Sequence, residues 1–183
     1  MLVKTFGSAV YGVEAITITV EVSVNNQGQN YYIVGLPDNA VKESQHRVES
    51  ALKSSGFFMP RNKTVVNLAP ADIRKEGSAY DLSIALCVLR ASAQVITDRL
   101  EEFIIMGELT LDGTLRPIRG VLPIAIQARK EGFKGFILPS DNAREAGIVN
   151  GLDIFPVTTL REAVDFLEEK ISIAAVQVDT REI

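Results

Sequence analysis

The chain has 183 residues, of which 46% are hydrophobic and 23% are charged, and its formal net charge is −4. These proportions are typical of one globular domain, and the net charge excludes a protein that is basic over its whole surface. One cysteine, Cys87, and one histidine, His46, exclude an internal disulfide, a multi-cysteine zinc site and a site built on several histidines.

The periodicity of apolar residues predicts a first half that leans towards β and a second half in which strands and helices alternate. Asp38 is the expected N-cap of the first helix, and Gly56 is its expected end. Asp112-Gly113 is the expected turn of a hairpin. The expected strands are 16–26, 30–37, 63–70, two within 102–118, 134–139 and 152–157, and the expected helices are 37–56, 78–94, 120–133, 140–148 and 159–170.

No apolar run approaches the ~20 residues that span a membrane. The first residues also lack the apolar core of a secretory signal, so we expect a cytoplasmic protein. The fold class that follows is α/β or α+β, with a mixed sheet packed by helices in one domain over residues 1–170. Residues 171–183 lose the pattern, and we expect them to form an edge strand or a linker.

Ser78 lies between a charged turn and a long apolar run, so it is either a nucleophile or the start of a helix. Ser78 and Asp81 have the spacing of a capping box, in which the serine accepts a backbone N–H bond three residues on. A serine nucleophile would need a base, and Lys75 is the one local candidate. The pattern favours the helix start, and it places Cys87 in the buried part of that helix.

Three long stretches, 34–52, 65–86 and 107–123, resemble in order the N-terminal domain of the ComM/YifB family of magnesium-chelatase-like AAA+ ATPases. The resemblance covers nearly the whole chain. It implies a Lon-protease-like fold, similar to the second domain of ribosomal protein S5. Family members join such a domain to an AAA+ module, and one is a hexameric helicase that promotes DNA branch migration during natural transformation.

The resemblance also implies that this domain is not a peptidase, and hence that this part of the protein is not an enzyme. When the motifs are laid over those of the Lon-like catalytic fold, the serine of the peptidase dyad falls on Ala79 and its lysine on Leu122. The sequence contains no GxxxxGK[ST] loop for nucleotide phosphates. We therefore expect a fragment without a cofactor of its own, and we expect ATP and Mg only in a missing ATPase module.

Basic residues border the position of the lost dyad. Arg74, Lys75, Arg116 and Arg119 are our candidates for DNA contact, because cations around a vacant site can meet phosphates. The expected partners are the protein's own AAA+ module, neighbouring subunits of a hexamer, and DNA, with no membrane. His46 is expected on the surface.

Three alternatives stay open at the level of sequence. The first is a Ser/Lys peptidase of Lon-like fold that uses Ser78 with Lys75, and the second is a chelatase accessory module. The third is a pure oligomerisation module. We expect no metal site, because Asp72, Glu76, Asp81 and Glu108 lack the spacing of a known cation motif and are read as caps and surface charges.

Overall fold

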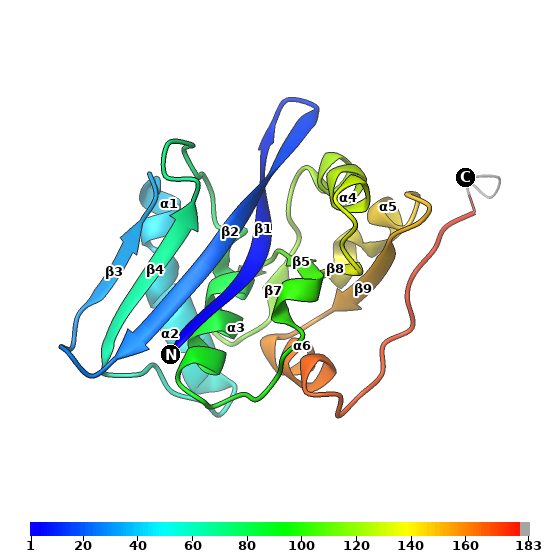
Figure 1. Ribbon diagram of the computed structural model, residues 1–183. Coiled ribbons are helices and arrows are strands. Elements are labelled where there is room, and N and C mark those ends of the chain that lie inside the picture. Colours follow the sequence, from blue (N-terminus) through cyan, green and yellow to red (C-terminus); the bar gives the residue numbers. More distant parts are fainter. Residues whose placement is uncertain (180–183) are drawn as a thin grey trace.

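The computed structural model describes residues 1–179, which form a mixed sheet with helices on both faces and a small separate hairpin (Figure 1). The strands are β1 (Leu2–Tyr11), β2 (Glu14–Asn25), β3 (Tyr31–Val34), β4 (Lys63–Ala69), β5 (Phe103–Ile105), β6 (Glu108–Leu109), β7 (Leu115–Arg116), β8 (Gly135–Pro139) and β9 (Asp153–Val157). The helices are α1 (Asn39–Lys42), α2 (Ser44–Ser54), α3 (Asp81–Ala91), α4 (Val121–Lys130), α5 (Ala143–Ala146) and α6 (Leu160–Leu167), with 3-10 turns η1 (Leu100–Glu102) and η2 (Ser140–Asn142).

The seven-stranded sheet has the order β3-β4-β2-β1-β5-β8-β9. β2 pairs antiparallel with both β1 and β4, whereas β3–β4, β1–β5, β5–β8 and β8–β9 are parallel pairs. The expected mixed sheet packed by helices is confirmed. The two halves of the chain share this one sheet, because β1 pairs with β2 on one side and with β5 on the other.

β1 is not among the strands expected from the sequence. It pairs with β2 along its whole length, from Leu2 opposite Ser23 to Tyr11 opposite Glu14. Its middle residues are buried whichever face they point to, because β1 is a central strand. Small and polar side chains fill these positions, so the alternation of apolar and polar residues that marks a one-sided strand is absent.

The expected hairpin at Asp112-Gly113 is confirmed, although its strands are short and stand outside the main sheet. Glu108 pairs with Arg116, and Leu109 with Leu115. The Asp112 carboxylate accepts bonds from the hydroxyls of Thr110 and Thr114 and from the Thr114 N–H, and these bonds lower its pKa to about 2. β5 is a third strand in the region where two were expected, and it lies inside the sheet.

The helix expected over 37–56 is split into α1 and α2 at Glu43. Asp38 is its N-cap, as expected, because its Oδ1 accepts the Val41 N–H at 2.8 Å. Gly56 follows α2 with a left-handed φ of +86°, which confirms the expected end.

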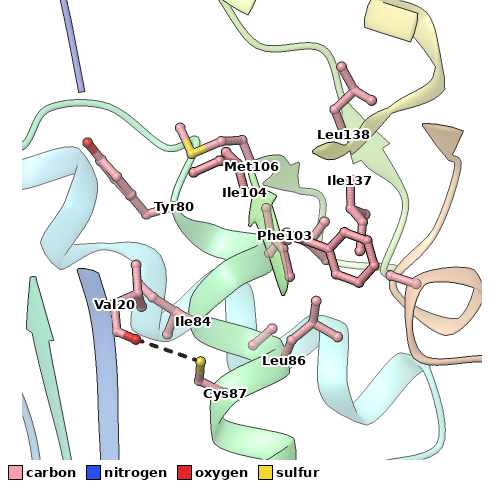
Figure 2. Packing of buried hydrophobic residues seen from close by; sticks show 14 of the residues in the cluster. Val20, Tyr80, Ile84, Leu86, Cys87, Phe103, Ile104, Met106, Ile137 and Leu138 are labelled. Carbon is pink, nitrogen blue, oxygen red and sulfur yellow. Dashed lines mark hydrogen bonds between the residues drawn. The ribbon is translucent and has the colours of Figure 1, made fainter. Parts of the chain in front are cut away.

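The core is centred on α3, whose residues Leu82–Leu89 are all buried (Figure 2). Cys87 is fully buried, and its Sγ lies 3.9 Å from the carbonyl oxygen of Val20. Burial raises the pKa of its thiol, so the expected packing role is confirmed.

α3 covers one face of β1 and β2. α4 covers the other, where Phe133 packs edge-on against Phe6 and Glu131 accepts a bond from Thr17.

Residues 171–179 run along the outer side of β9 as an irregular segment rather than a regular strand (Figure 1). The Val176 N–H donates to the Ile154 carbonyl at 2.8 Å, and the Val178 N–H donates to the Gly147 carbonyl at 2.9 Å. The remaining residues of the expected edge strand or linker, 180–183, lie outside the described residues.

Gly35 at the end of β3 provides a test of the fold. Its φ is +108°, and a Cβ built there would lie 2.0 Å from the Leu68 carbonyl oxygen. We expect Gly35→Ala to lower the free energy of unfolding by about 3 kcal/mol or more, since it combines backbone strain with a clash against backbone. Urea unfolding would measure this loss.

The matched control is Gly132→Ala, where φ is +79° and a Cβ would meet no heavy atom within 4 Å. It carries the backbone strain alone and should cost about 1 kcal/mol. Equal losses in the two variants would contradict the close packing of β3 on β4.

Candidate functional site

The candidate site is a cleft of about 580 Å³ at the end of β1. It is lined by Ser8–Tyr11 of β1, by Arg74 and residues 76–80 of the turn over 74–80, and by the segment 117–119 before α4. Met106 and Glu108 also line it. Ser78 and Ala79 both line it, so it contains the expected serine position of the lost dyad.

Lys75 fixes the turn from within. Its N–H donates to the Leu36 carbonyl at 3.0 Å, and its carbonyl accepts the Asp38 N–H at 2.9 Å. Its Nζ donates to the carbonyl oxygens of Gly35 and Pro70, and the whole side chain is buried. Burial lowers the pKa of Lys75. The expected DNA contact by Lys75 is therefore wrong, because its ammonium is inside the protein and bonded to backbone carbonyls.

Asp38 holds the other part of the turn. While Oδ1 caps α1, Oδ2 accepts the Gly77 N–H at 3.1 Å. Gly77 has a φ of +87°, which a side chain rarely allows, so a glycine suits the turn before the serine. The start of α1 and the serine turn are thus connected by one carboxylate.

The expected capping box of Ser78 and Asp81 is wrong. The N-cap of α3 is Tyr80, without a side-chain bond, and Ser78 contributes only its carbonyl, which accepts the Asp81 N–H at 3.3 Å. The Ser78 hydroxyl instead donates to Oε1 of Glu108. Glu108 in turn pairs with Arg116 at 3.2 Å.

Asp81 is buried rather than on the surface, which corrects its reading as a cap or surface charge. Its Oδ2 lies 2.7 Å from Nε of Arg47 and accepts the Leu109 N–H at 3.1 Å, and its Oδ1 accepts from Nη2 of Arg47 at 3.0 Å. Arg47 also donates to the Ala40 carbonyl at 2.7 Å. Burial raises the pKa of Asp81 from 3.8 to about 6, against the opposing effect of Arg47.

The cleft lacks the groups of a serine peptidase in working positions. The Ser78 hydroxyl bonds to a carboxylate, while the Lys75 amine bonds to two carbonyls. Ala79, at the aligned serine position, has only a methyl group, and Leu122, at the aligned lysine position, is a half-buried part of α4 that packs on the core. His46 is exposed on α2 and does not line the cleft.

The remaining predicted cations lie at the surface around the cleft. Arg74 and Arg119 line it, and Arg116 borders it through Glu108. Arg74 pairs with Glu76 at 3.3 Å, so two of the three arginines have acidic partners. Arg119 is exposed, and within residues 1–179 no ion pair reaches it. With Asp38, Glu76 and Glu108 also in the lining, the cleft is close to neutral.

Residues 1–179 contain no group of three or more His, Cys, Asp or Glu side chains placed to hold a metal ion. In the same part of the chain, no helix has both the length and the apolar character that crossing a membrane requires.

Comparison of the sequence with known proteins identifies relatives of this chain. Residues 20–142 match the family model described as subunit ChlI of Mg-chelatase. The chain is 43% identical over 162 residues to the uncharacterized protein YifB of Escherichia coli, covering 88% of this chain and 32% of that protein. It is 40% identical over 175 residues to the competence protein ComM of Haemophilus influenzae, covering 94% of this chain and 34% of that protein.

A more distant similarity concerns the fold. The chain is 24% identical over 160 residues to the Lon protease of Brevibacillus choshinensis, covering 81% of this chain and 20% of that protein. This match agrees with the expected Lon-like fold. The chain spans about a third of the length of YifB and ComM.

The buried carboxyl of Asp81 gives a test by pH. Because its pKa is higher in the folded protein than in the unfolded chain, the folded state binds the proton more tightly between about pH 4 and pH 6. The contribution of this group to stability therefore falls as the pH rises through that window. Asparagine cannot ionise, so Asp81→Asn should lack the trend.

We expect the stability of the wild-type protein relative to Asp81→Asn to fall by about 2 kcal/mol from pH 4 to pH 7. Urea unfolding at several pH values would measure the difference. The exposed Asp153→Asn controls for the loss of one carboxylate. A difference between wild type and Asp81→Asn that stays constant with pH would contradict the raised pKa.

Proposed function

Because the chain belongs to the Mg-chelatase-like family of YifB and ComM, matched by the ChlI model, we propose that it is a non-catalytic N-terminal domain of an AAA+ ATPase. In this role it helps to assemble the ring of subunits and to engage DNA. ATP and Mg belong to the ATPase module of the whole protein, and branch migration of DNA is the proposed activity of the whole assembly.

The observation that carries the non-catalytic part is the bonding of Ser78 and Lys75. A Ser/Lys peptidase needs a lysine amine within hydrogen-bond reach of the serine hydroxyl. Here the Lys75 amine donates to the carbonyls of Gly35 and Pro70, and the Ser78 hydroxyl donates to the Glu108 carboxylate, so the two groups are not paired with each other. The chelatase alternative has no support in a cluster of ligands within residues 1–179.

The DNA-engaging part rests on the exposed arginines around the cleft. Arg119 has no acidic partner among the described residues, and the side chain of Arg116 is 66% exposed although it pairs with Glu108. A surface ion pair contributes little to stability, so Arg116 can exchange Glu108 for a phosphate at small cost. Guanidinium groups suit this role because they hold phosphates with two parallel bonds.

The test is fluorescence anisotropy of this chain with labelled single-stranded and forked DNA at low and moderate salt. Arg116→Ala/Arg119→Ala should weaken binding and reduce the slope of log affinity against log salt by about 1.4 for a single strand, because two cations are lost. The matched control is Lys130→Ala/Lys134→Ala, at the other end of α4. Of this pair, Lys134 is ion-paired with Glu102 and Lys130 has no ion pair within residues 1–179.

Equal losses in the two double variants would mean that net charge alone matters, and they would contradict contact at the cleft. Absence of binding even at low salt would leave DNA to the ATPase module. In that case, light scattering of the whole protein with and without residues 1–170 would test the ring-assembly part, with loss of ring-sized particles as the expected result.

A further inference from the structure

A second hollow lies at the end of the sheet away from the cleft. It is a groove of about 930 Å³ between α2, the loop over 57–62 and the first residues of β3 and β4. The two hollows lie towards opposite ends of β3. Tyr31, its first residue, lines the groove, and Asp38, which lines the cleft, comes shortly after its last residue, Val34. Three aromatic rings (Tyr31, Phe57 and Phe58), two cations (Lys53 and Arg61) and one acid (Glu49) line it.

The charge around this groove is opposite in sign to that of the whole molecule. Lys53 and Arg61 are exposed in the lining. Arg161 flanks it through one of the lining rings, with its guanidinium 4.3 Å from the centre of the Phe57 ring. The groove therefore attracts anions, whereas the chain carries a net charge of −4.

Phe58 is presented to solvent on a fixed backbone. It is 61% exposed. Its N–H donates to Oε1 of Gln94 at 3.0 Å, and its carbonyl accepts from Nε2 of Gln94 at 2.8 Å. Ser92 holds the same amide at 2.9 Å. The backbone that carries the ring is therefore ordered on folding rather than on binding, which favours the use of Phe58 as a contact surface.

One feature of the groove opposes an anion, and the structure offsets it. The carbonyl end of α2 lies beside Lys53 and carries the negative end of the helix dipole. Nη2 of Arg161 donates to the Ser55 carbonyl at 2.5 Å, just beyond the last turn of α2. A guanidinium therefore neutralises the end of the helix that would otherwise repel a phosphate.

We infer that this groove binds single-stranded nucleic acid, with a base stacked on Phe58 and phosphates held by Lys53 and Arg61. Exposed aromatic faces combined with cations are the common means of binding single strands. The neutral amides of Asn30 and Asn62, also in the lining, can bond to base edges. This site is separate from the arginines around the cleft and does not depend on them.

The sharpest test uses the absence of tryptophan from the chain. Phe58→Trp introduces a single tryptophan and keeps an aromatic face at the position. Titration with an unlabelled oligothymidylate of about 12 nucleotides should quench its fluorescence to saturation, because the base stacks on the indole. The control is Ala175→Trp, which should not be quenched. Ala175 is exposed beside β9, at the opposite edge of the seven-stranded sheet from β3, and it lines neither the groove nor the cleft.

A second measurement is the anisotropy of the labelled oligonucleotide. Phe58→Ala should weaken binding about tenfold. Lys53→Ala/Arg61→Ala should reduce the slope of log affinity against log salt by about 1.4, while Lys130→Ala/Lys134→Ala leaves it unchanged. All of these side chains are on the surface, and an unchanged urea midpoint would verify that each variant is folded.

Unquenched fluorescence of the Phe58→Trp variant or full binding by Phe58→Ala would overturn the inference. So would polyglutamate that quenches as strongly as the oligonucleotide, since the groove would then take an acidic peptide. Loss of binding in Arg116→Ala/Arg119→Ala alone would support the cleft and overturn the groove. Loss in the groove variants alone would support the groove and overturn DNA contact at the cleft.

Discussion

The buried ion pair between Arg47 and Asp81 is the contact on which the arrangement of the cleft depends. It joins α2 to the first residue of α3, and through the Ala40 carbonyl and the Leu109 N–H it also reaches α1 and β6. A buried carboxylate is costly unless it is paired and hydrogen-bonded, and Asp81 meets both conditions. Because β6 is held in this way, Glu108 lies where it can accept the Ser78 hydroxyl and pair with Arg116.

Much of the fold could be predicted from local patterns, and the exceptions have tertiary causes. The alternation in β2, the cap at Asp38 and the Asp112-Gly113 turn are local signals, and all three appear in the structure. β1 could not be recognised because it is covered on both faces and contains buried polar residues such as Thr5, whose hydroxyl donates to the Leu100 carbonyl at 2.6 Å. A pattern based on one wet face does not describe a central strand.

The candidate site was less predictable for the same reason. Arg74 and Lys75 are adjacent and both charged, yet Arg74 is at the surface and Lys75 is buried. The carbonyls of Gly35 and Pro70 that accept the ammonium come from other parts of the chain, so no local pattern could indicate them. Asp81 likewise has the spacing of a capping residue, but Arg47, 34 residues earlier, holds it in the interior. The assignment of Ala79 and Leu122 to the dyad positions rests only on the order of motifs, and it stays a prediction.

The distribution of charge explains how an acidic chain can carry a cationic groove. In the cleft, Glu76 and Glu108 neutralise Arg74 and Arg116, so a ligand there must displace ion pairs before it gains contacts. In the groove, Lys53 and Arg61 form no ion pair within residues 1–179. The neighbouring Arg161 faces the ring of Phe57, and a ring leaves most of a cation's charge available to a phosphate. The chain therefore separates two kinds of arginine and lysine: those that hold the surface of the cleft together and those that remain available to an anion. Because net charge adds the two together, its value of −4 does not describe either surface.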